Sequence, residues 1–339
     1  MNKKRKRNSG LKSPEASIII LNWNQPNFSV SCVKSVLKEK GSYEILLVDN
    51  NSKDDSVNVF KKEFGNNGKV KIIVSDKNLG YAGGNNLGVK HSKGEFVIIL
   101  NNDTTVEKGW FNELLKTIKS SKEIGAVNAY EIRNGKKPDS KVRSHYKARL
   151  NVLQYGVIIK RKTPLKNIDV VKSIGVKGAC FIYRKKIQNP PFDEDYFLFA
   201  EDAKLSWIIR CKGYKIASAK NAVYNHFHSA TRKSSSKFDY EAVFLGERNR
   251  LMNLLTFYNC FTTLKLVPFL LLNVVAVNVI QPKYVFMRLK AYFWLLFHTG
   301  MIIRKRKEIR AIKKVSEKTL LKDMTWRLWP RSAKVYDKK

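Results

Sequence analysis

A carboxylate at the end of an apolar segment is the first candidate for chemistry in this 339-residue chain. Asp103 lies in the sequence NNDT at 101–104, directly after the apolar run EFVIIL. Magnesium typically takes one or two protein carboxylates and fills its other positions with water and substrate phosphates. A cation held by Asp103 would neutralise the charge that builds on a departing diphosphate. The alternative is that Asp103 caps a helix at 106–119.

Two adjacent carboxylates, Glu201 and Asp202, form the second candidate. They stand near the start of a helix that the sequence predicts over 199–212, among aromatic residues. Transfer of a group to an alcohol requires a base within hydrogen-bond reach of the attacking hydroxyl. Partial burial can raise the basicity of a carboxylate. The alternative is that both charges only complement the helix dipole.

A basic, hydroxyl-rich loop at 225–237 is the third candidate. It holds His226 and His228, two of the five histidines in the chain, together with Arg232 and Lys233. Histidine nitrogens bind metal ions, and basic side chains form charge-assisted hydrogen bonds with phosphate. The loop therefore predicts contact with a metal ion or a diphosphate, although a single histidine is more often structural.

A glycine-rich stretch, NLGYAGGNN at 78–86, is the fourth candidate. It lacks the spacing of a dinucleotide fingerprint and follows the third predicted strand instead of the first. It predicts a tight turn where the backbone approaches a ligand, with a helix N-terminus at Asn85. We expect it to form a nucleotide pocket with the loops at Asp49 and Asp103.

The scaffold for these residues is predicted to be an α/β fold. Short, nearly continuous apolar runs are typical of strands in a parallel sheet covered on both faces, and they alternate with helical spacing. The strands are expected at 16–21, 43–48, 70–74 and 95–100, and the helices at 28–38, 54–64 and 84–91. Ligands of such sheets bind at the carboxyl ends of the strands, where the polar segments lie.

The second half is predicted less sharply. Residues 131–177 are basic and weakly periodic, so an irregular excursion is expected there. Regular structure is expected again at 178–183 and 215–219 as strands, and at 239–258 as a long amphipathic helix.

The C-terminal third combines apolar runs with positive charge. Residues 266–282 and 291–303 carry no charge, and from Gln281 onward 17 Lys and Arg face 4 Asp and Glu, a net charge of +13. A spanning helix needs about 20 apolar residues, so these runs suit helices that lie in the interface of an anionic cytoplasmic leaflet. The alternative is that they pack on the preceding domain. Three parts are expected: a basic flexible tail at 1–14, a domain at 15–258 and a helical extension at 259–339.

Eight sequence blocks in this order resemble the inverting family 2 glycosyltransferases with the GT-A fold, in particular the rhamnosyltransferase-like branch. The blocks are ILNWN at 20–24, VDNNS at 48–52, NLGYAGGNN at 78–86, LNNDT at 100–104, GACFIYRK at 178–185, FDEDYFLFAED at 192–202, HFHSAT at 226–231 and ERNR at 247–250. The resemblance implies a Rossmann-like, mostly parallel central sheet with a membrane-associating helical extension.

The resemblance also implies roles for single residues. Asp103 and His226 would bind Mg²⁺ or Mn²⁺ with the donor diphosphate, and Asp202 would be the catalytic base beside Glu201. The nucleotide-sugar contacts would be Asn22, Asp49, Asn51, Gly83, Gly84, Asn85, Asn102 and Arg232. Two positions depart from the family pattern, because Asn101 replaces the first acid of D-x-D and Ala203-Lys204-Leu205 follows the Glu201-Asp202 pair.

The expected activity is transfer of a sugar from a nucleotide-diphosphate sugar to a saccharide or lipid-linked acceptor, in the assembly of cell-surface glycans. The expected location is the cytoplasmic face of the cell membrane, peripheral or monotopic. The net charge of +37 also suits a nucleic-acid-binding protein, but it is spread along the chain and no nucleic-acid-binding signature accompanies it. We therefore expect no nucleic-acid partner. A catalytically silent, carbohydrate-binding scaffold is the other alternative.

Overall fold

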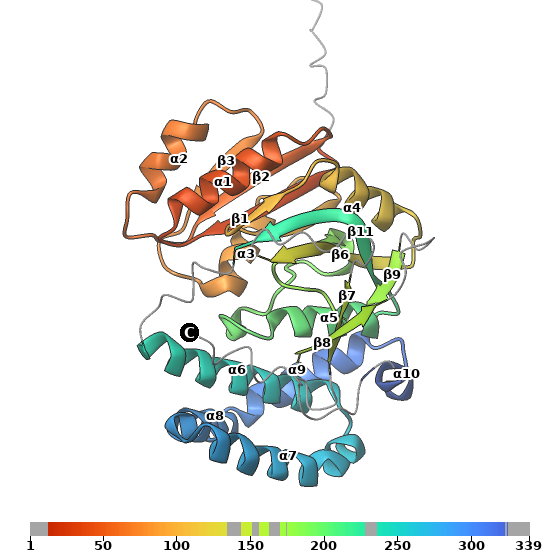
Figure 1. Cartoon of the computed structure of the whole chain (residues 1–339). Coiled ribbons are helices and arrows are strands. Elements are labelled where there is room, and N and C mark those ends of the chain that lie inside the picture. The colour runs from red at the N-terminus through yellow and green to blue at the C-terminus, as the bar shows by residue number, and fades with distance from the viewer. Residues whose placement is uncertain are drawn as a thin grey trace, which may run out of the picture.

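The computed structural model describes residues 13–133, 144–150, 156–162, 170–173, 175–227, 236–322 and 324. It contains a nine-stranded mixed sheet, helices on the faces of that sheet, and a layer of C-terminal helices below it (Figure 1). The α/β class predicted from the sequence is confirmed.

The first four long strands form the parallel part of the sheet, in the order β3-β2-β1-β4. The side chains of β1, β2 and β4 are buried on both faces, in two separate hydrophobic clusters, which explains why their sequences are nearly continuously apolar, whereas the edge strand β3 is only partly buried. The strands are β1 (Ala16–Asn22), β2 (Tyr43–Asp49), β3 (Val70–Val74) and β4 (Phe96–Asn101), and the helices between them are α1 (Pro26–Leu37), α2 (Ser56–Phe64) and α3 (Gly80–Lys90).

Beyond β4 the sheet becomes mixed. Strand β10 (Cys180–Arg184) runs antiparallel to β4 and to β6 (Ile124–Arg133). Strand β11 (Lys215–His226) is parallel to β6 and antiparallel to β5 (Thr104–Val106) and β9 (Val170–Ser173). The sheet is therefore parallel over β3-β2-β1-β4 and mixed from β10 onward.

Two local expectations were wrong. The segment expected to be a helix at 106–119 is the end of the short strand β5 followed by α4 (Trp110–Lys119). The N-cap residue of α4 is Gly109. Asp103 therefore does not cap this helix. The region 131–177 contains the end of β6, the hairpin of β7 (Ser144–Leu150) with β8 (Gly156–Lys162), and β9.

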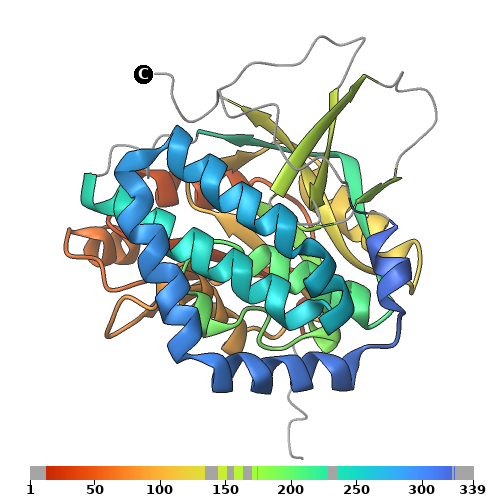
Figure 2. The same cartoon turned by 90° about the horizontal axis from the view of Figure 1, so that it is seen from below.

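The C-terminal part is helical, as expected. Figure 2 shows these helices from below, where they form a layer across the molecule. They are α5 (Glu201–Cys211), α6 (Ser236–Phe257), α7 (Cys260–Ile280), α8 (Val285–Phe297), α9 (Thr299–Ile312) and α10 (Glu317–Leu321). The short 3₁₀ helices are η1 (Lys185–Ile187), η2 (Glu194–Tyr196) and η3 (Pro282–Tyr284).

The helices after residue 258 share a core with α5 and α6. Trp207 of α5 stacks on Phe257 of α6 with ring centroids 5.1 Å apart, and Ile309 of α9 and Leu266 of α7 join the same cluster. Burying such large apolar side chains stabilises the contact by about 1.5–3 kcal/mol each. The layer is thus anchored to the helix that begins with Glu201. A domain boundary near residue 258 stays a prediction.

Candidate active site

The carboxyl ends of β2, β1 and β4 lie side by side. Asn22 is in register with Asp49 of β2, and Leu21 with Asn101 of β4. Parallel strands end at the same edge of a sheet, so the polar residues that follow them are brought together by the topology. The candidate residues at these strand ends therefore lie along one edge, as predicted.

Asp49 and Asn22 are joined by hydrogen bonds below the surface. The Asn22 amide donates to Asp49 Oδ1 at 2.9 Å, and the Ser52 amide and hydroxyl donate to the same carboxylate at 2.9 and 2.6 Å. Asn22 also accepts from Ser29 Oγ at 2.7 Å. Asp49 is 1% exposed and Asn22 is fully buried. These contacts fix the loop after β2, and the loop itself faces outward.

That loop is tied to the glycine-rich stretch. Asn50 Nδ2 donates to Asn78 Oδ1 at 2.9 Å, and Asn50 Oδ1 accepts from the Leu79 amide at 2.9 Å. Asn51 has a positive φ of 62° and donates to the Asp76 carbonyl. The blocks VDNNS and NLGYAGGNN therefore form one unit at the sheet edge.

The glycine-rich stretch is a helix and not the predicted turn. Helix α3 begins at Gly80, so Gly83, Gly84 and Asn85 lie inside it and are buried. A Cβ on Gly84 would lie 2.5 Å from Leu21 Cδ1, so the absence of a side chain lets α3 pack closely on β1. Asn85 donates to the Tyr81 carbonyl at 2.8 Å. The expected helix start at Asn85 was wrong, and contact of these three residues with a nucleotide stays a prediction.

Asp103 and His226 are brought together by strand pairing. β5 pairs with the end of β11 so that Thr104 faces His226, and the Phe227 amide donates to the Asp103 carbonyl at 3.0 Å. As a result His226 Nε2 lies 3.2 Å from Asp103 Oδ1. Both residues are 7% exposed.

Glu131 on β6 completes this group, and the sequence interpretation missed it. Its Oε1 lies 3.0 Å from His226 Nδ1, and it is 8% exposed. Burial lowers the pKa of His226, but hydrogen bonds to Asp103 and Glu131, and the charges of these residues, raise it to about 9. The signal for Glu131 was an acid on an apolar strand, and it was overlooked because that strand was not predicted.

Two asparagines before Asp103 complete this edge. Asn102 Nδ2 donates to Ser29 Oγ at 3.1 Å and to Gln25 Oε1 at 3.3 Å, which joins the segment to α1. Asn101 Oδ1 is buried and has no hydrogen-bond partner among the described residues. A buried oxygen without a hydrogen-bond partner favours the interpretation that a bound ligand or ion interacts with it.

Glu201 and Asp202 form the first turn of α5. Asp202 Oδ2 accepts from the Gly178 amide at 3.2 Å, and Oδ1 accepts from the Ala203 amide at 2.7 Å. Glu201 is 6% exposed, and its Oε2 has no hydrogen-bond partner among the described residues. The pKa of Glu201 is raised, mainly by burial and to a lesser extent by the charge of Asp202. Burial also raises the pKa of Asp202, although hydrogen bonds from backbone amides lower it in part.

Tyr81 links the carboxylate pair to the sheet edge and was also missed. Its hydroxyl donates to the Gly178 carbonyl at 2.5 Å, and the Gly178 amide donates to Asp202. The next residue, Ala179, accepts from the Asn101 amide at 2.9 Å. Burial raises the pKa of Tyr81, and the charges of Glu201, Asp202 and Asp103 raise it further, so all three acids lie within electrostatic reach of one hydroxyl.

The capacity of this edge to hold a metal rests on two side chains. No group of three or more histidine, cysteine or acidic side chains is arranged as a metal site within the described ranges. Asp103 Oδ1 and His226 Nε2 do converge, and two protein ligands suffice for a cation that takes its other ligands from phosphates and water. The residues present therefore fit such an ion. His228 and Arg232 lie outside the described residues.

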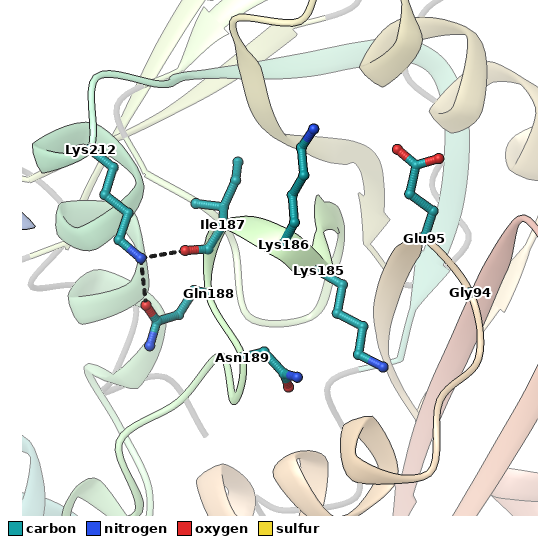
Figure 3. Close-up of a pocket in the computed structure, with 8 residues that line it drawn as sticks. All are labelled: Gly94, Glu95, Lys185, Lys186, Ile187, Gln188, Asn189 and Lys212. Carbon is teal, nitrogen blue, oxygen red and sulfur yellow. Dashed lines mark hydrogen bonds between the residues drawn. The ribbon is translucent and has the colours of Figure 1, made fainter.

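A basic pocket lies at the opposite end of β4 (Figure 3). Two of its three lysines are already engaged: Lys185 Nζ donates to the Ser92 carbonyl at 2.8 Å, and Lys212 Nζ donates to Gln188 Oε1 at 3.1 Å. It is lined by Gly94, Glu95, Lys185, Lys186, Ile187, Gln188, Asn189 and Lys212. None of the candidate residues borders it.

The fold is that of the GT-A glycosyltransferases. The structure aligns with that of GalNAc-T7 with UDP, GalNAc and Mn²⁺ at a TM-score of 0.59 and 17% identity, over 74% of this chain and 49% of the other. It aligns with the mannosyltransferase PcManGT from Pyrobaculum calidifontis, in complex with GDP-Man and Mn²⁺, at a TM-score of 0.50 and 12% identity, over 89% and 83% of the chains. These likenesses confirm the predicted GT-A fold.

The sequence gives the family. Residues 17–189 match the model of the glycosyl transferase family 2, and the chain belongs to this family. The chain is 26% identical over 115 residues to the glycosyltransferase GlyG of Streptococcus pneumoniae, covering 34% of this chain and 38% of that protein. It is 25% identical over 240 residues to the O-antigen biosynthesis protein RfbC of Myxococcus xanthus, covering 66% of this chain and 18% of that protein. The chain therefore spans well under half the length of these relatives.

Proposed function

We propose that the chain transfers a sugar from a nucleotide-diphosphate sugar to a hydroxyl of a saccharide or lipid-linked acceptor, with inversion at the anomeric carbon. The observation that carries this proposal is the connection of two acidic centres across one sheet edge. Asp103 pairs with His226, and Asp202 accepts from the Gly178 amide. The residue after Gly178, Ala179, accepts from the Asn101 amide at 2.9 Å, two residues before Asp103, which connects the two centres. This arrangement supports a diphosphate centre and a base centre in one site.

The donor is proposed to lie along the ends of β1, β2 and β4. Asn22 and Asp49 would act mainly by fixing the loop that carries Asn51, since both are buried and bonded to each other. Asn102 and Arg232 are proposed to contact the sugar nucleotide, and Gly83, Gly84 and Asn85 to set the position of α3 beside it. UDP and GDP-Man are named for the GalNAc-T7 and PcManGT structures, which supports a nucleotide-linked donor here.

Asp103 and His226 are proposed to hold Mg²⁺ or Mn²⁺. The Nε2 atom of His226 would lose its proton and bind the ion, while Nδ1 keeps its hydrogen bond to Glu131, an arrangement typical of metal-binding histidines. When bound, the cation would offset the charge on the leaving diphosphate. Mn²⁺ is named in both GT-A structures, and Asn101 in place of an acid leaves one carboxylate for this role.

Asp202 is proposed to be the catalytic base. It would take the proton of the acceptor hydroxyl as that oxygen attacks the anomeric carbon and the bond to the nucleoside diphosphate breaks. The Gly178 and Ala203 amides hold its carboxylate in place. Glu201, buried directly beside it, would raise the proton affinity of Asp202 whenever both are ionised.

We also propose that the chain belongs to the rhamnosyltransferase-like branch of the family, because its eight sequence blocks occur in the order of that branch. The O-antigen biosynthesis protein of Myxococcus xanthus and the poly-β-1,6-N-acetyl-D-glucosamine synthase of Staphylococcus epidermidis are among the relatives. They support a role in assembling cell-surface polysaccharide or glycoconjugate. Released nucleoside diphosphate in the presence of an acceptor would distinguish this enzyme from a silent carbohydrate-binding scaffold.

A membrane location is proposed from α7 and α8, whose outward faces are apolar. On α7 the two buried residues are Leu266 and Asn273, so the polar side chain of Asn273 points inward, whereas Leu264, Leu271 and Leu272 point outward. This is the reverse of the pattern expected for a surface helix in water. The exposed large apolar residues are Phe261, Leu264, Val267, Phe269, Leu271, Leu272, Val275, Val279 and Ile280 on α7, and Phe286, Leu289, Phe293, Leu296 and Phe297 on α8.

The charge around this surface favours anionic lipid as its partner. No acidic residue occurs between Arg248 and Lys307, whereas eight Lys and Arg occur from residue 260 to 307. A second copy of a chain with net charge +37 would be repelled, and an anionic leaflet would be attracted.

We propose that α7 lies in the membrane plane. It is long and apolar enough to cross a membrane, and no other helix in the described part of the chain is. However, Leu266 packs in the core shared with α5 and α6, and Arg288 of α8 donates to the Val277 carbonyl at 3.2 Å and to Asn278 Oδ1 at 3.0 Å. These contacts hold α7 along the body of the protein.

The decisive test of the transfer reaction is a thermal-shift screen of nucleotide sugars with Mn²⁺, followed by detection of transfer with the best donor. A ligand that binds the folded chain raises its melting temperature. Stabilisation by one donor, with release of its nucleoside diphosphate when an acceptor is added, would support the proposal. No stabilisation by any donor, with or without the metal, would contradict it.

A further inference from the structure

The loop that leads into the carboxylate pair has an unusual backbone. Phe197, Phe199 and Ala200 all have positive φ, at 56°, 70° and 61°. Residues with a Cβ rarely adopt this region, and such conformations persist only where the surroundings enforce them. Ala200 is followed directly by Glu201 and Asp202, so whatever enforces this loop also sets where α5 begins.

The enforcing side chains come from the ERNR block on α6, whose role the sequence left unassigned. Asn249 Nδ2 lies 2.8 Å from the Tyr196 carbonyl oxygen, 2.9 Å from that of Leu198 and 2.8 Å from that of Phe199. Its Oδ1 accepts from Arg248 Nε at 2.8 Å, which orients the amide.

Neighbouring residues bind the other carbonyls of the loop. Asn253 Nδ2 donates to the Ala200 carbonyl at 3.2 Å, and Arg248 donates to the Asp195 carbonyl at 2.6 Å. The Phe197 carbonyl accepts from the Ala82 amide of α3 at 3.1 Å. Every carbonyl from Asp195 to Ala200 is therefore bound, five of them by side chains of one stretch of α6.

The chemistry of position 249 requires an amide. Asn249 and Asn253 are fully buried, so water cannot replace their hydrogen bonds. A carboxylate at 249 would face three carbonyl oxygens without a proton to donate, and an apolar side chain would leave those oxygens unpaired. A serine would supply one donor in place of two.

The segment before the loop is fixed from α9 and α5. Lys305 Nζ lies 2.5 Å from Asp193 Oδ2 and 2.6 Å from Asp195 Oδ2, and Lys204 of α5 also pairs with Asp193. Lys204 and Lys305 are buried. The residues before the loop are thus held by α5 and α9, and Asn249 binds the carbonyls at the centre of the loop.

We propose that Asn249 is a positioning residue for the transfer step. It holds the loop at 196–200, in which Phe197, Phe199 and Ala200 have positive φ, and so fixes Asp202 relative to the acceptor hydroxyl, without touching substrate. Asn253 acts in the same way on Ala200. This inference rests on the proposed function of Asp202 as the base.

The test compares Asn249→Asp, Asn249→Ser and Asn253→Ser with the control Thr256→Val. Thr256 lies on the same helix and is buried, and among the described residues its hydroxyl bonds only to the Met252 carbonyl within that helix. The first readout is hydrogen–deuterium exchange of the peptide covering 197–204, measured on the full chain. We expect exchange about tenfold faster in the three asparagine variants and unchanged in Thr256→Val. Unchanged exchange in the folded Asn249 variants overturns the proposal.

The second readout is transfer with the donor that the thermal-shift screen identifies. We expect kcat to fall roughly 100-fold in Asn249→Asp, because a misplaced base loses most of its effect. The KM for the donor and the affinity for UDP or GDP with Mn²⁺ should stay within about twofold of the unaltered chain. A loss of nucleotide affinity equal to the loss of kcat overturns the proposal.

The two experiments separate the inference from the proposed function. If Asn249→Asp does not fold, Asn249→Ser and Asn253→Ser carry both readouts. If the unaltered chain transfers no sugar while the loop exchanges faster in the variants, the proposed function fails and the structural role of Asn249 stands. If transfer is normal in a variant whose loop exchanges faster, the positioning role is wrong and the proposed function stands.

Discussion

His226 Nε2 lies 3.2 Å from Asp103 Oδ1, although the two residues are more than 120 positions apart in the chain. The pairing of β5 with the end of β11 produces this contact, and Glu131 holds the other ring nitrogen at 3.0 Å. A metal-dependent diphosphate site follows from this geometry as a testable proposal.

Replacement of Asp103 by alanine should remove the metal-dependent part of nucleotide binding, because one of two proposed ligands is lost. Thermal stabilisation by UDP and GDP would be measured with and without Mn²⁺. A ligand at 100 times its Kd stabilises the folded chain by about 2.7 kcal/mol, which sets the size of the expected effect. Asp239→Asn, an exposed acid on α6, is the control. Retention of the full Mn²⁺ effect in Asp103→Ala would exclude the ligand role.

Replacement of Asp202 by asparagine should lower kcat by about 10²–10⁴-fold while leaving donor affinity unchanged, because a neutral amide cannot accept the acceptor proton. Burial raises the pKa of Asp202, and the base must be ionised to act. The transfer rate of the unaltered chain should therefore rise with pH through that raised pKa. The measurement is a pH–rate profile with saturating donor. Near-normal transfer by Asp202→Asn would show that another group is the base.

Glu201→Gln should stabilise the chain increasingly as pH rises. Burial raises the pKa of Glu201 in the folded chain above its unfolded value, so the folded state binds the proton more tightly. The stability that this carboxyl contributes is complete below the unfolded pKa, at about 4.3, and is lost as pH rises through the folded pKa. Melting temperatures at pH 5, 7 and 9 should show a growing advantage of the variant. An advantage that is equal at all three pH values would contradict the buried, proton-binding carboxyl.

Charged substitutions on the apolar surface of α7 and α8 should weaken binding to lipid vesicles. Leu271 is 62% exposed and Phe293 is 56% exposed, and loss of each from a membrane should weaken binding by about 1.5–3 kcal/mol, or more than tenfold. Leu271→Glu and Phe293→Glu would be compared by co-sedimentation with phosphatidylglycerol vesicles. Val74→Glu, at a residue that is 51% exposed on β3, is the control. Equal binding of all three variants would exclude this surface.

Gly84→Ala should destabilise the chain by about 1–3 kcal/mol through overpacking. Its new Cβ would lie 2.5 Å from Leu21 Cδ1, whereas a Cβ on Gly68 meets nothing within 4 Å. Gly68→Ala, in a turn, is therefore the control without a steric clash, and chemical denaturation is the measurement. Equal stability of the two variants would show that α3 does not depend on close packing at Gly84.

The sequence predicted well those elements whose burial is uniform along the strand. β1, β2 and β4 are buried on both faces, so their apolar runs stand out without knowledge of their neighbours. Because a helix connects each strand to the next, these strands run parallel and end at the same edge of the sheet. This is why Asn22, Asp49 and Asp103 could be assigned to one edge before the structure was known.

Elements stabilised by distant partners were predicted poorly. The start of α3 depends on Asn78, whose side chain accepts from the Gly80 amide at 2.8 Å, and on Asn50 from the neighbouring loop. β5 has three residues and exists through its pairing with β11. Neither segment has a hydrophobic periodicity of its own. The residue types alone therefore predicted a turn at 78–86 and a helix at 106–119.

The amino-acid sequence by itself determined the α/β class, the polar strand ends and the candidate acids, because these depend on residue types and short spacings. Only the tertiary structure decided that Glu131 and Tyr81 belong to the site, that Asn249 holds the loop before Asp202, and that Leu271 and Leu272 of α7 face outward. The physical reason is that hydrogen bonds and burial are properties of partners in space. Residues such as Asn249 and Phe199, 50 positions apart, meet only after the chain has folded.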